Sequence, residues 1–267
     1  MTQIDAFGPR QTDRRYRPVL TAHTNPKGVL DVDTVKGCTA GTAKHPKGCY
    51  GDCYAAKMAR VYGMDFSTSV SRRPVPGFLS GVLRVVAAHH LRWYRTGVAG
   101  DPSHDWANTV NVCELLRCTR KTPVVVTKHW RIAQDDDLRR LADVGTVFNT
   151  STSGMDTDAE IKHRVGQLTR IAAFGMRSVC RVVTCRFGGS EWARRCREAQ
   201  KYLLSFPLVI DTPFRTTSKH PHVANGDILL SKRSDSVGGG SRSVSLWSDT
   251  PYLGTCADCP DQCGVAN

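Results

Sequence analysis

Two patterns of apolar residues alternate along the chain. Runs of apolar, β-branched residues are typical of buried strands, and apolar residues that recur every three or four positions are typical of amphipathic helices. The first pattern predicts six strands, at residues 28–35, 91–94, 122–128, 146–152, 178–185 and 208–211. The second predicts helices at residues 54–61, 77–90, 107–118, 135–142, 159–174 and 191–204. Strands that alternate with helices indicate a parallel sheet covered on both faces.

The length of the alternating region narrows the fold class. It covers about 190 residues, whereas a barrel of eight strand–helix units typically needs about 250. The sequence therefore predicts an α/β protein with a partial (β/α)6 TIM-like barrel. We expect a basic N-terminal arm at residues 1–28, the barrel at residues 29–215 and a small Cys-rich extension at residues 216–267. In such barrels the chemistry lies at the carboxyl ends of the strands.

Three cysteines follow the first predicted strand. Cys38, Cys49 and Cys53 lie in a glycine-rich, basic loop, and Cys53 directly precedes a predicted helix. Thiolates at the N-terminus of a helix have a low pKa and bind metals. Three cysteines can hold three irons of a cubane cluster and leave the fourth iron open. Zinc sites share such spacings, so the loop predicts either an iron–sulfur cluster or zinc.

A second cysteine motif lies in the C-terminal extension. Cys256, Cys259 and Cys263 form a Cys-x2-Cys-x3-Cys pattern. Its spacing predicts a second metal site, either an iron–sulfur cluster or zinc. A fourth ligand is missing from the motif itself. The candidates elsewhere in the chain are Cys185, Cys118, His220 and His222.

Composition indicates the compartment and the partners. The 267 residues include 11 cysteines but no apolar run long enough for a transmembrane helix, and the polar N-terminus does not resemble a signal peptide. We therefore expect no membrane association and a cytoplasmic protein. Lys and Arg exceed Asp and Glu by 13, which favours nucleic acid as partner over an evenly spread solubility charge. The arm residues Arg14, Arg15, Tyr16 and Arg17 either make such contacts or belong to a disordered, solvated tail.

Taken together, these features resemble the radical S-adenosylmethionine (SAM) superfamily, most closely its compact phage-type and spore-photoproduct-lyase-like members. The resemblance covers roughly residues 29–215. It is carried by Gly37-Cys38 after the first strand, Cys53-Tyr54-Ala55 at the end of the loop, the glycine-rich segment 97–102, the strand 123–128, and the strand and helix of residues 146–175. Two features depart from the family pattern. The loop reads Cys-x10-Cys-x3-Cys where Cys-x3-Cys-x2-Cys is common, and Asp52 stands where an aromatic residue is usual.

The resemblance implies a cofactor and a mechanism. Cys38, Cys49 and Cys53 would hold a 4Fe–4S cluster whose open iron binds SAM. An electron from an external donor would cleave SAM to a 5′-deoxyadenosyl radical, which takes a hydrogen atom from the substrate. The resemblance also implies contacts to SAM: Gly100 and Asp101 to its amino group, Asn149 and Ser151 to its ribose, Lys128 and Arg164 to its carboxylate, and either Tyr54 or Tyr50 beside its adenine.

The substrate is inferred from the charge together with the resemblance. A net charge of +13 favours a nucleic acid as substrate. With the resemblance, this implies modification or repair of a nucleobase, with DNA favoured and phage DNA hypermodification, in the cytoplasm of the host, as the most specific form. A base within a duplex would have to be flipped out to react. Two alternatives stay open: a radical SAM enzyme that acts on a peptide or small molecule, and a non-catalytic protein that binds zinc and nucleic acid.

Overall fold

The computed structural model describes residues 17–235 and 242–265. Its longer strands are β5 (Trp93–Thr96), β6 (Thr122–Thr127), β7 (Val147–Ser153), β8 (Arg177–Thr184), β10 (Val209–Thr216) and β13 (Arg242–Ser245). Its two-residue strands are β1 (His23–Thr24), β2 (Leu30–Asp31), β3 (Val35–Lys36), β4 (Val70–Ser71), β9 (Arg186–Phe187), β11 (Ile228–Leu229) and β12 (Ser234–Asp235). The helices are α1 (Thr39–Lys44), α2 (Tyr54–Val61), α3 (Pro76–Ala88), α4 (Trp106–Leu116), α5 (Asp135–Asp143), α6 (Asp158–Ala173), α7 (Glu191–Leu204) and α8 (Pro221–Ala224).

The central sheet has nine strands in the order β1-β2-β5-β6-β7-β8-β10-β13-β12. Neighbouring strands from β2 to β10 are parallel. The pairs at the two edges, β1 with β2 and β13 with both β10 and β12, are antiparallel. The protein is therefore a mixed α/β structure with a large, mostly parallel sheet, as the alternating sequence pattern predicts.

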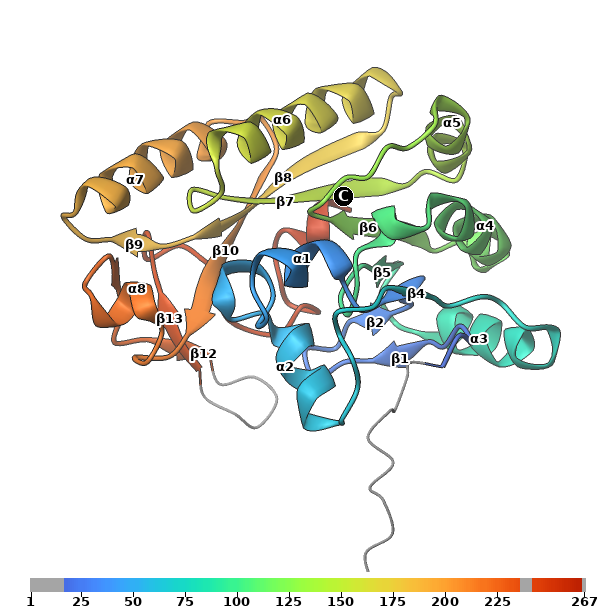
Figure 1. Cartoon of the computed structure of the whole chain (residues 1–267). Coiled ribbons are helices and arrows are strands. Elements are labelled where there is room, and N and C mark those ends of the chain that lie inside the picture. Colours follow the sequence, from blue (N-terminus) through green and yellow to red (C-terminus); the bar gives the residue numbers. More distant parts are fainter. Residues whose placement is uncertain (1–16, 236–241, 266–267) are drawn as a thin grey trace, which may run out of the picture.

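The strands follow an arc, with α3 to α7 outside it and the segment containing α1 and α2 inside it (Figure 1). The outer layer follows from the amphipathic helices. In α6, Ile161 and Leu168 are buried against Cys180 and Val182 of β8. Thr157 caps the same helix through a reciprocal hydrogen-bonded capping box with its third residue, Glu160, which fixes where the helix begins.

Alternate residues of the parallel strands point into the arc. Near the amino ends of the strands, apolar side chains pack into one cluster that also contains Cys263; its strand members include Trp93, Val124, Val147, Val179 and Ile210. Farther along β7 and β8, Ser151 and Val183 line a pocket that also contains the first cysteine loop. The apolar cluster thus lies toward the amino ends of these strands, and the first cysteine loop lies toward their carboxyl ends.

The predicted elements are found within a few residues of their expected bounds, with two differences. The expected strand 28–35 is interrupted between β2 and β3, where Asp33 turns its carboxylate to the backbone N–H groups of Gly97 and Val98, at 3.0 and 2.7 Å. The last of the six predicted strands corresponds to β10, which continues to Thr216 and pairs with β13. The expected boundary at residue 215 therefore falls within a strand, and the extension contributes to the sheet.

The expectations on the arm and on membranes have different outcomes. Arg14, Arg15 and Tyr16 lie outside the described residues. For residues 17–235 and 242–265, none of the helices combines the length and the apolar character that crossing a bilayer requires.

Candidate functional site

The three cysteines of the first loop line one pocket of about 320 Å³. Cys38 precedes α1, and its Sγ accepts a hydrogen bond from the backbone N–H of Gly41 at 3.3 Å. Cys49 begins a short 3-10 turn, and Cys53 directly precedes α2. The segments that follow the parallel strands β5 and β6 contribute Asp101, Lys128 and His129 to the same pocket. The loop therefore lies at the carboxyl ends of the strands, as predicted.

Gly41 keeps a space open between the sulfurs. A Cβ at this position would lie 3.1 Å from the Sγ of Cys38, 3.4 Å from the Sγ of Cys49 and 3.6 Å from the Nε2 of His129. The same Nε2 lies 3.6 Å from the Sγ of Cys49. Two thiols and an imidazole thus surround a gap that exists because residue 41 has no side chain.

Burial determines the protonation of the thiols. It is the main cause that raises the pKa of Cys38 to about 12, with a further contribution from the charge of Asp101. Burial also raises the pKa of Cys49, against the opposing charge of Lys128, and the pKa of Cys53. The expected low-pKa thiolates are therefore corrected: desolvation outweighs the helix termini. A metal that binds here has to displace protons from the thiols.

The spacing of these groups bears on which metal fits. Within residues 17–235 and 242–265, no group of three or more His, Cys, Asp or Glu side chains is placed to hold a metal ion. Zinc gathers its thiolates around one ion, whereas in a cubane each cysteine binds a different iron. The thiols of Cys38 and Cys49 border the gap at Gly41, and Cys53 lines the same pocket, so the three donors are spread around a pocket rather than gathered around one point.

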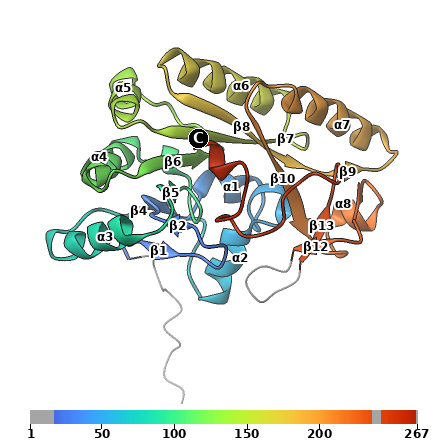
Figure 2. The same cartoon turned by 180° about the vertical axis from the view of Figure 1, so that it is seen from behind.

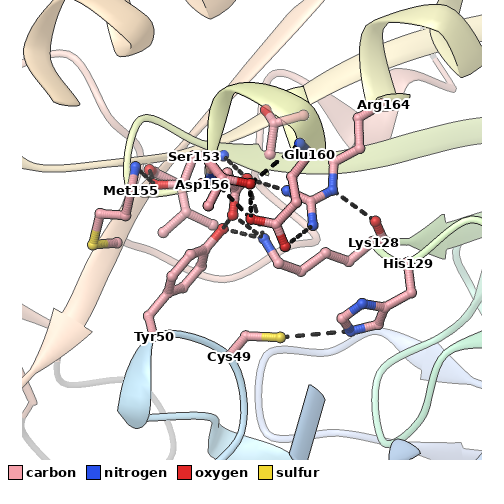
Figure 3. A network of polar contacts seen from close by, with 12 residues as sticks. Cys49, Tyr50, Lys128, His129, Ser153, Met155, Asp156, Glu160 and Arg164 are labelled. Atoms are coloured by element: carbon pink, nitrogen blue, oxygen red, sulfur yellow. Dashed lines mark hydrogen bonds and ion pairs between the residues drawn. The ribbon is translucent and has the colours of Figure 1, made fainter. Parts of the chain in front are cut away.

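A buried network of charges fixes the loop from one side (Figure 3). Its centre is Asp156, whose carboxylate pairs with Arg164 and, at 3.0 Å, with the Nζ of Lys128. The hydroxyl of Tyr50 donates to the same carboxylate at 2.7 Å. Tyr50 directly follows Cys49 and has a φ of 58°, in the left-handed region that non-glycine residues rarely adopt. The network therefore holds a strained residue beside a candidate ligand.

Lys128 and Arg164 already have an anionic partner in this network. Burial lowers the pKa of Lys128. The pKa of Asp156 is lowered, because the two cations outweigh the effect of its burial. Both cations were expected to contact the carboxylate of SAM, and the sequence pattern did not single out Asp156. Its position in the turn after β7 is a signal that could have identified it, since the other polar candidates also follow strands.

Asp101 and the glycine-rich segment before it are engaged with the protein's own backbone, so they are not free to contact a ligand. The Oδ1 of Asp101 accepts from Thr127 and from the N–H of Ser103, and its Oδ2 accepts from the N–H groups of Lys128 and His129, at 2.7–3.0 Å. A Cβ on Gly100 would lie 2.4 Å from the carbonyl oxygen of Val35. The glycine-rich segment thus approaches neighbouring backbone, and the carboxylate expected to meet the amino group of SAM is occupied by four donors.

The remaining residues that were expected to contact SAM lie in two different places. Ser151 and Tyr54 line the pocket of the three cysteines, and Tyr54 is 54% exposed. Asn149, two residues before Ser151, is fully buried, and its Nδ2 donates to the carbonyl oxygen of Cys263 at 2.9 Å. Asn149 therefore lies beside the second cysteine motif, which corrects its expected place beside a ribose at the first.

The second motif closes the opposite end of the interior. The segment with α1 lies in front in Figure 1, and the C-terminal segment lies in front in Figure 2. Cys256 and Cys263 join the apolar cluster at the amino ends of the strands. Gln262 ties the loop together: its Nε2 donates to three carbonyl groups and its Oε1 accepts from Trp93 at 3.0 Å. Gln262 and Cys263 both have positive φ, 42° and 54°.

None of the proposed fourth ligands joins this motif. Cys185 is fully buried in a different cluster, with Cys196 and Phe187, which corrects its assignment. Cys118 is exposed after α4. His220 lies near the first loop, with its Nε2 2.7 Å from the carbonyl oxygen of Tyr50. His222 stacks on Trp192.

Comparison of the chain with family models, with curated proteins and with solved structures finds no match.

Proposed function

We propose that this protein is a radical SAM enzyme whose parallel strands form a partial (β/α)6 barrel. The observation that carries the proposal is the convergence of Cys38, Cys49 and Cys53 on one pocket at the carboxyl ends of parallel strands, with Gly41 leaving a gap between sulfurs. Both the position and the donor set suit a 4Fe–4S cluster. When bound, the cluster would supply the electron that cleaves SAM.

The chain itself supplies binding, orientation and exclusion of water. The three cysteines would hold the cluster. Tyr50 and its partners Asp156, Lys128 and Arg164 keep the loop in its conformation. Asp101 fixes the segment after β6 and so places His129 beside the gap. Ser151 and Tyr54 line the space in which SAM would bind.

The substrate we propose is a nucleobase in nucleic acid, DNA in the first instance. The net charge of +13 supports a polyanionic partner. We further propose that Cys256, Cys259 and Cys263 hold a second iron–sulfur cluster or zinc. An external electron donor is required, because the reaction consumes an electron.

The test is anaerobic reconstitution with iron and sulfide, followed by reduction and addition of SAM. We expect about four irons at the first site and formation of 5′-deoxyadenosine. Zinc without 5′-deoxyadenosine would contradict the proposal and support a non-catalytic zinc protein that binds nucleic acid. Deoxyadenosine without any effect of added DNA or RNA would point instead to a peptide or a small molecule.

Two matched variants assign the two motifs. Cys38→Ala is expected to abolish cleavage of SAM, whereas Cys256→Ala is expected to spare at least part of it. Full cleavage by the Cys38→Ala protein would show that the first loop does not hold the SAM cluster.

A further inference from the structure

A cavity of about 610 Å³ lies between the two cysteine motifs. Its lining runs from Tyr54 and Ala55, next to the first loop, to Cys256 and Cys263 of the second motif. This volume is in the range of sites that enclose small organic ligands. The cavity therefore offers a binding site that both motifs reach.

The basic side chains that line the cavity are mostly paired with carboxylates. Arg95 contacts Asp31 at 3.2 Å and Lys36 contacts Asp33 at 3.0 Å. Lys27 and Arg215 both pair with Asp235. These pairs neutralise most of the positive charge around the cavity.

Arg181 is different. Its Nη1 has two long contacts, 3.5 Å to the Oδ1 of Asn149 and 3.9 Å to the Sγ of Cys263. In the part of the chain that the structure describes, no Asp or Glu forms an ion pair with it. Its neighbours in β8, Cys180 and Val182, pack outward against α6 and α7. Alternation along the strand therefore turns Arg181 inward, to line the cavity.

Arg181 is half-buried, and the partial loss of water around a guanidinium is unfavourable unless the group meets an anion. Its planar fork of N–H donors matches the oxygens of phosphate and carboxylate groups, and two long contacts leave most of these donors available. Elsewhere along the lining, Tyr62 and Tyr252 offer aromatic rings, which can stack on a base. An anion site and aromatic rings in one cavity suit a nucleotide.

We infer that this cavity binds a nucleotide and that Arg181 binds its phosphate. The choice of a nucleotide over other phosphate esters rests on the proposed function, whose substrate it specifies further. The nucleotide is either free or a unit of a nucleic acid, and both present the same phosphate and base.

The test is calorimetric titration of the reconstituted protein, without SAM or reductant, with four probes: a nucleoside 5′-monophosphate, a short single-stranded oligonucleotide, the nucleoside and inorganic phosphate. We expect Arg181→Gln to weaken binding of the monophosphate or of the oligonucleotide about 10- to 100-fold, because charged hydrogen bonds are lost. Binding of the nucleoside should change little. Arg194→Gln, at an exposed position of α7, is the matched control and should bind like the wild type.

Arg181→Lys keeps the charge without the fork and should give an intermediate loss, which separates recognition of phosphate from a general defect in folding. The inference is overturned if the wild type binds neither nucleotide probe. It is also overturned if Arg181→Gln binds them as the wild type does, or if that change lowers only the metal content. Nucleotide binding without cleavage of SAM would overturn the proposed function but not the assignment of this cavity. Cleavage of SAM without nucleotide binding would overturn the assignment of this cavity but not the proposed function.

Discussion

At the scale of single residues, Asp156 explains more of the site than any residue that the sequence suggested. Its side chain is almost fully buried and faces two cations and a phenol. Buried charges persist in proteins when they are paired and hydrogen-bonded. The position of Tyr50, and through it the path of the chain after Cys49, depends on this carboxylate.

Asp156→Asn should therefore be strongly destabilising. The amide cannot neutralise Lys128 or Arg164, and removing one partner of a buried ion pair costs about 3–5 kcal/mol. Urea denaturation measures the change in the free energy of unfolding. Asp158→Asn is the control, because Asp158 is 91% exposed and pairs with Arg195 at the surface, where such pairs contribute about 0–1 kcal/mol. Equal effects of the two changes would show that the network does not stabilise the fold.

Gly41→Ala tests the gap between the thiols. Alanine favours a helix over glycine by about 1 kcal/mol, but its Cβ would lie 3.1 Å from the Sγ of Cys38, which has to move. The two effects oppose each other, so the stability of the apo-protein should change little. The new methyl group would contact the sulfurs of Cys38 and Cys49, so we expect reconstituted iron to fall by at least about half, an estimate from the crowding of a close-packed site. Gly166→Ala is the control, because a Cβ there meets no atom within 4 Å. Normal iron content in the Gly41→Ala protein would contradict a cluster in this gap.

At the scale of elements, the alternation of strand and helix patterns was sufficient to predict the parallel core. Periodicity reports burial, and burial is what packs α6 on β8. Elements of two residues, such as β1 and β4, carry no such period, and the helix α1 has one buried residue, Gly41. These were missed because their conformation is set by contacts with distant segments.

The candidate site was predictable only in part, for a related reason. The rule that chemistry follows the carboxyl ends of strands identified the segments of Asp101, Lys128 and Ser151. It could not distinguish a polar group that faces a ligand from one that accepts hydrogen bonds from backbone N–H groups, as Asp101 does. Nor could spacing reveal that Asn149 lies beside Cys263, since that contact joins residues 114 positions apart.

Glu160 links two elements, and its titration should be measurable. Burial alone would raise its pKa, but Lys44, Thr157 and Arg164 lower it to about 2, from an ordinary value of 4.5. Because the folded value is the lower one, the stabilisation is complete above pH 4.5 and is lost as the pH falls toward 2. Glu160→Gln keeps a residue that can complete the capping box but removes the charge.

The free energy of unfolding of the Glu160→Gln protein should therefore depend less on pH between 4.5 and 2 than that of the wild type, as measured by urea denaturation at each pH. Glu191→Gln, at the exposed first turn of α7, is the matched control. Parallel curves for wild type and Glu160→Gln would mean that the contact between α1 and α6 does not hold the carboxylate in its charged form.

At the scale of the whole molecule, the two cysteine motifs come together around one interior. They are separated by more than 200 residues in the sequence, yet one cavity reaches Tyr54 beside the first and Cys263 of the second. The parallel sheet makes this possible, because its inward side chains form layers from one strand end to the other. Two metal sites there would act on one enclosed ligand rather than on separate partners.

The net charge of +13 leads to a prediction about salt. If the protein binds nucleic acid through phosphates, binding releases counterions. The logarithm of the binding constant then falls linearly with the logarithm of the salt concentration. On a single strand the slope is about −0.7 for each neutralised phosphate. Fluorescence anisotropy with a labelled oligonucleotide between about 50 and 200 mM salt measures the slope. We expect several neutralised phosphates. Arg181→Gln should reduce the slope by about the contribution of one phosphate, which a charge spread evenly over the surface would not do. A slope near zero, or no binding at low salt, would contradict a nucleic-acid substrate while leaving the chemistry of the first cysteine loop to its own test.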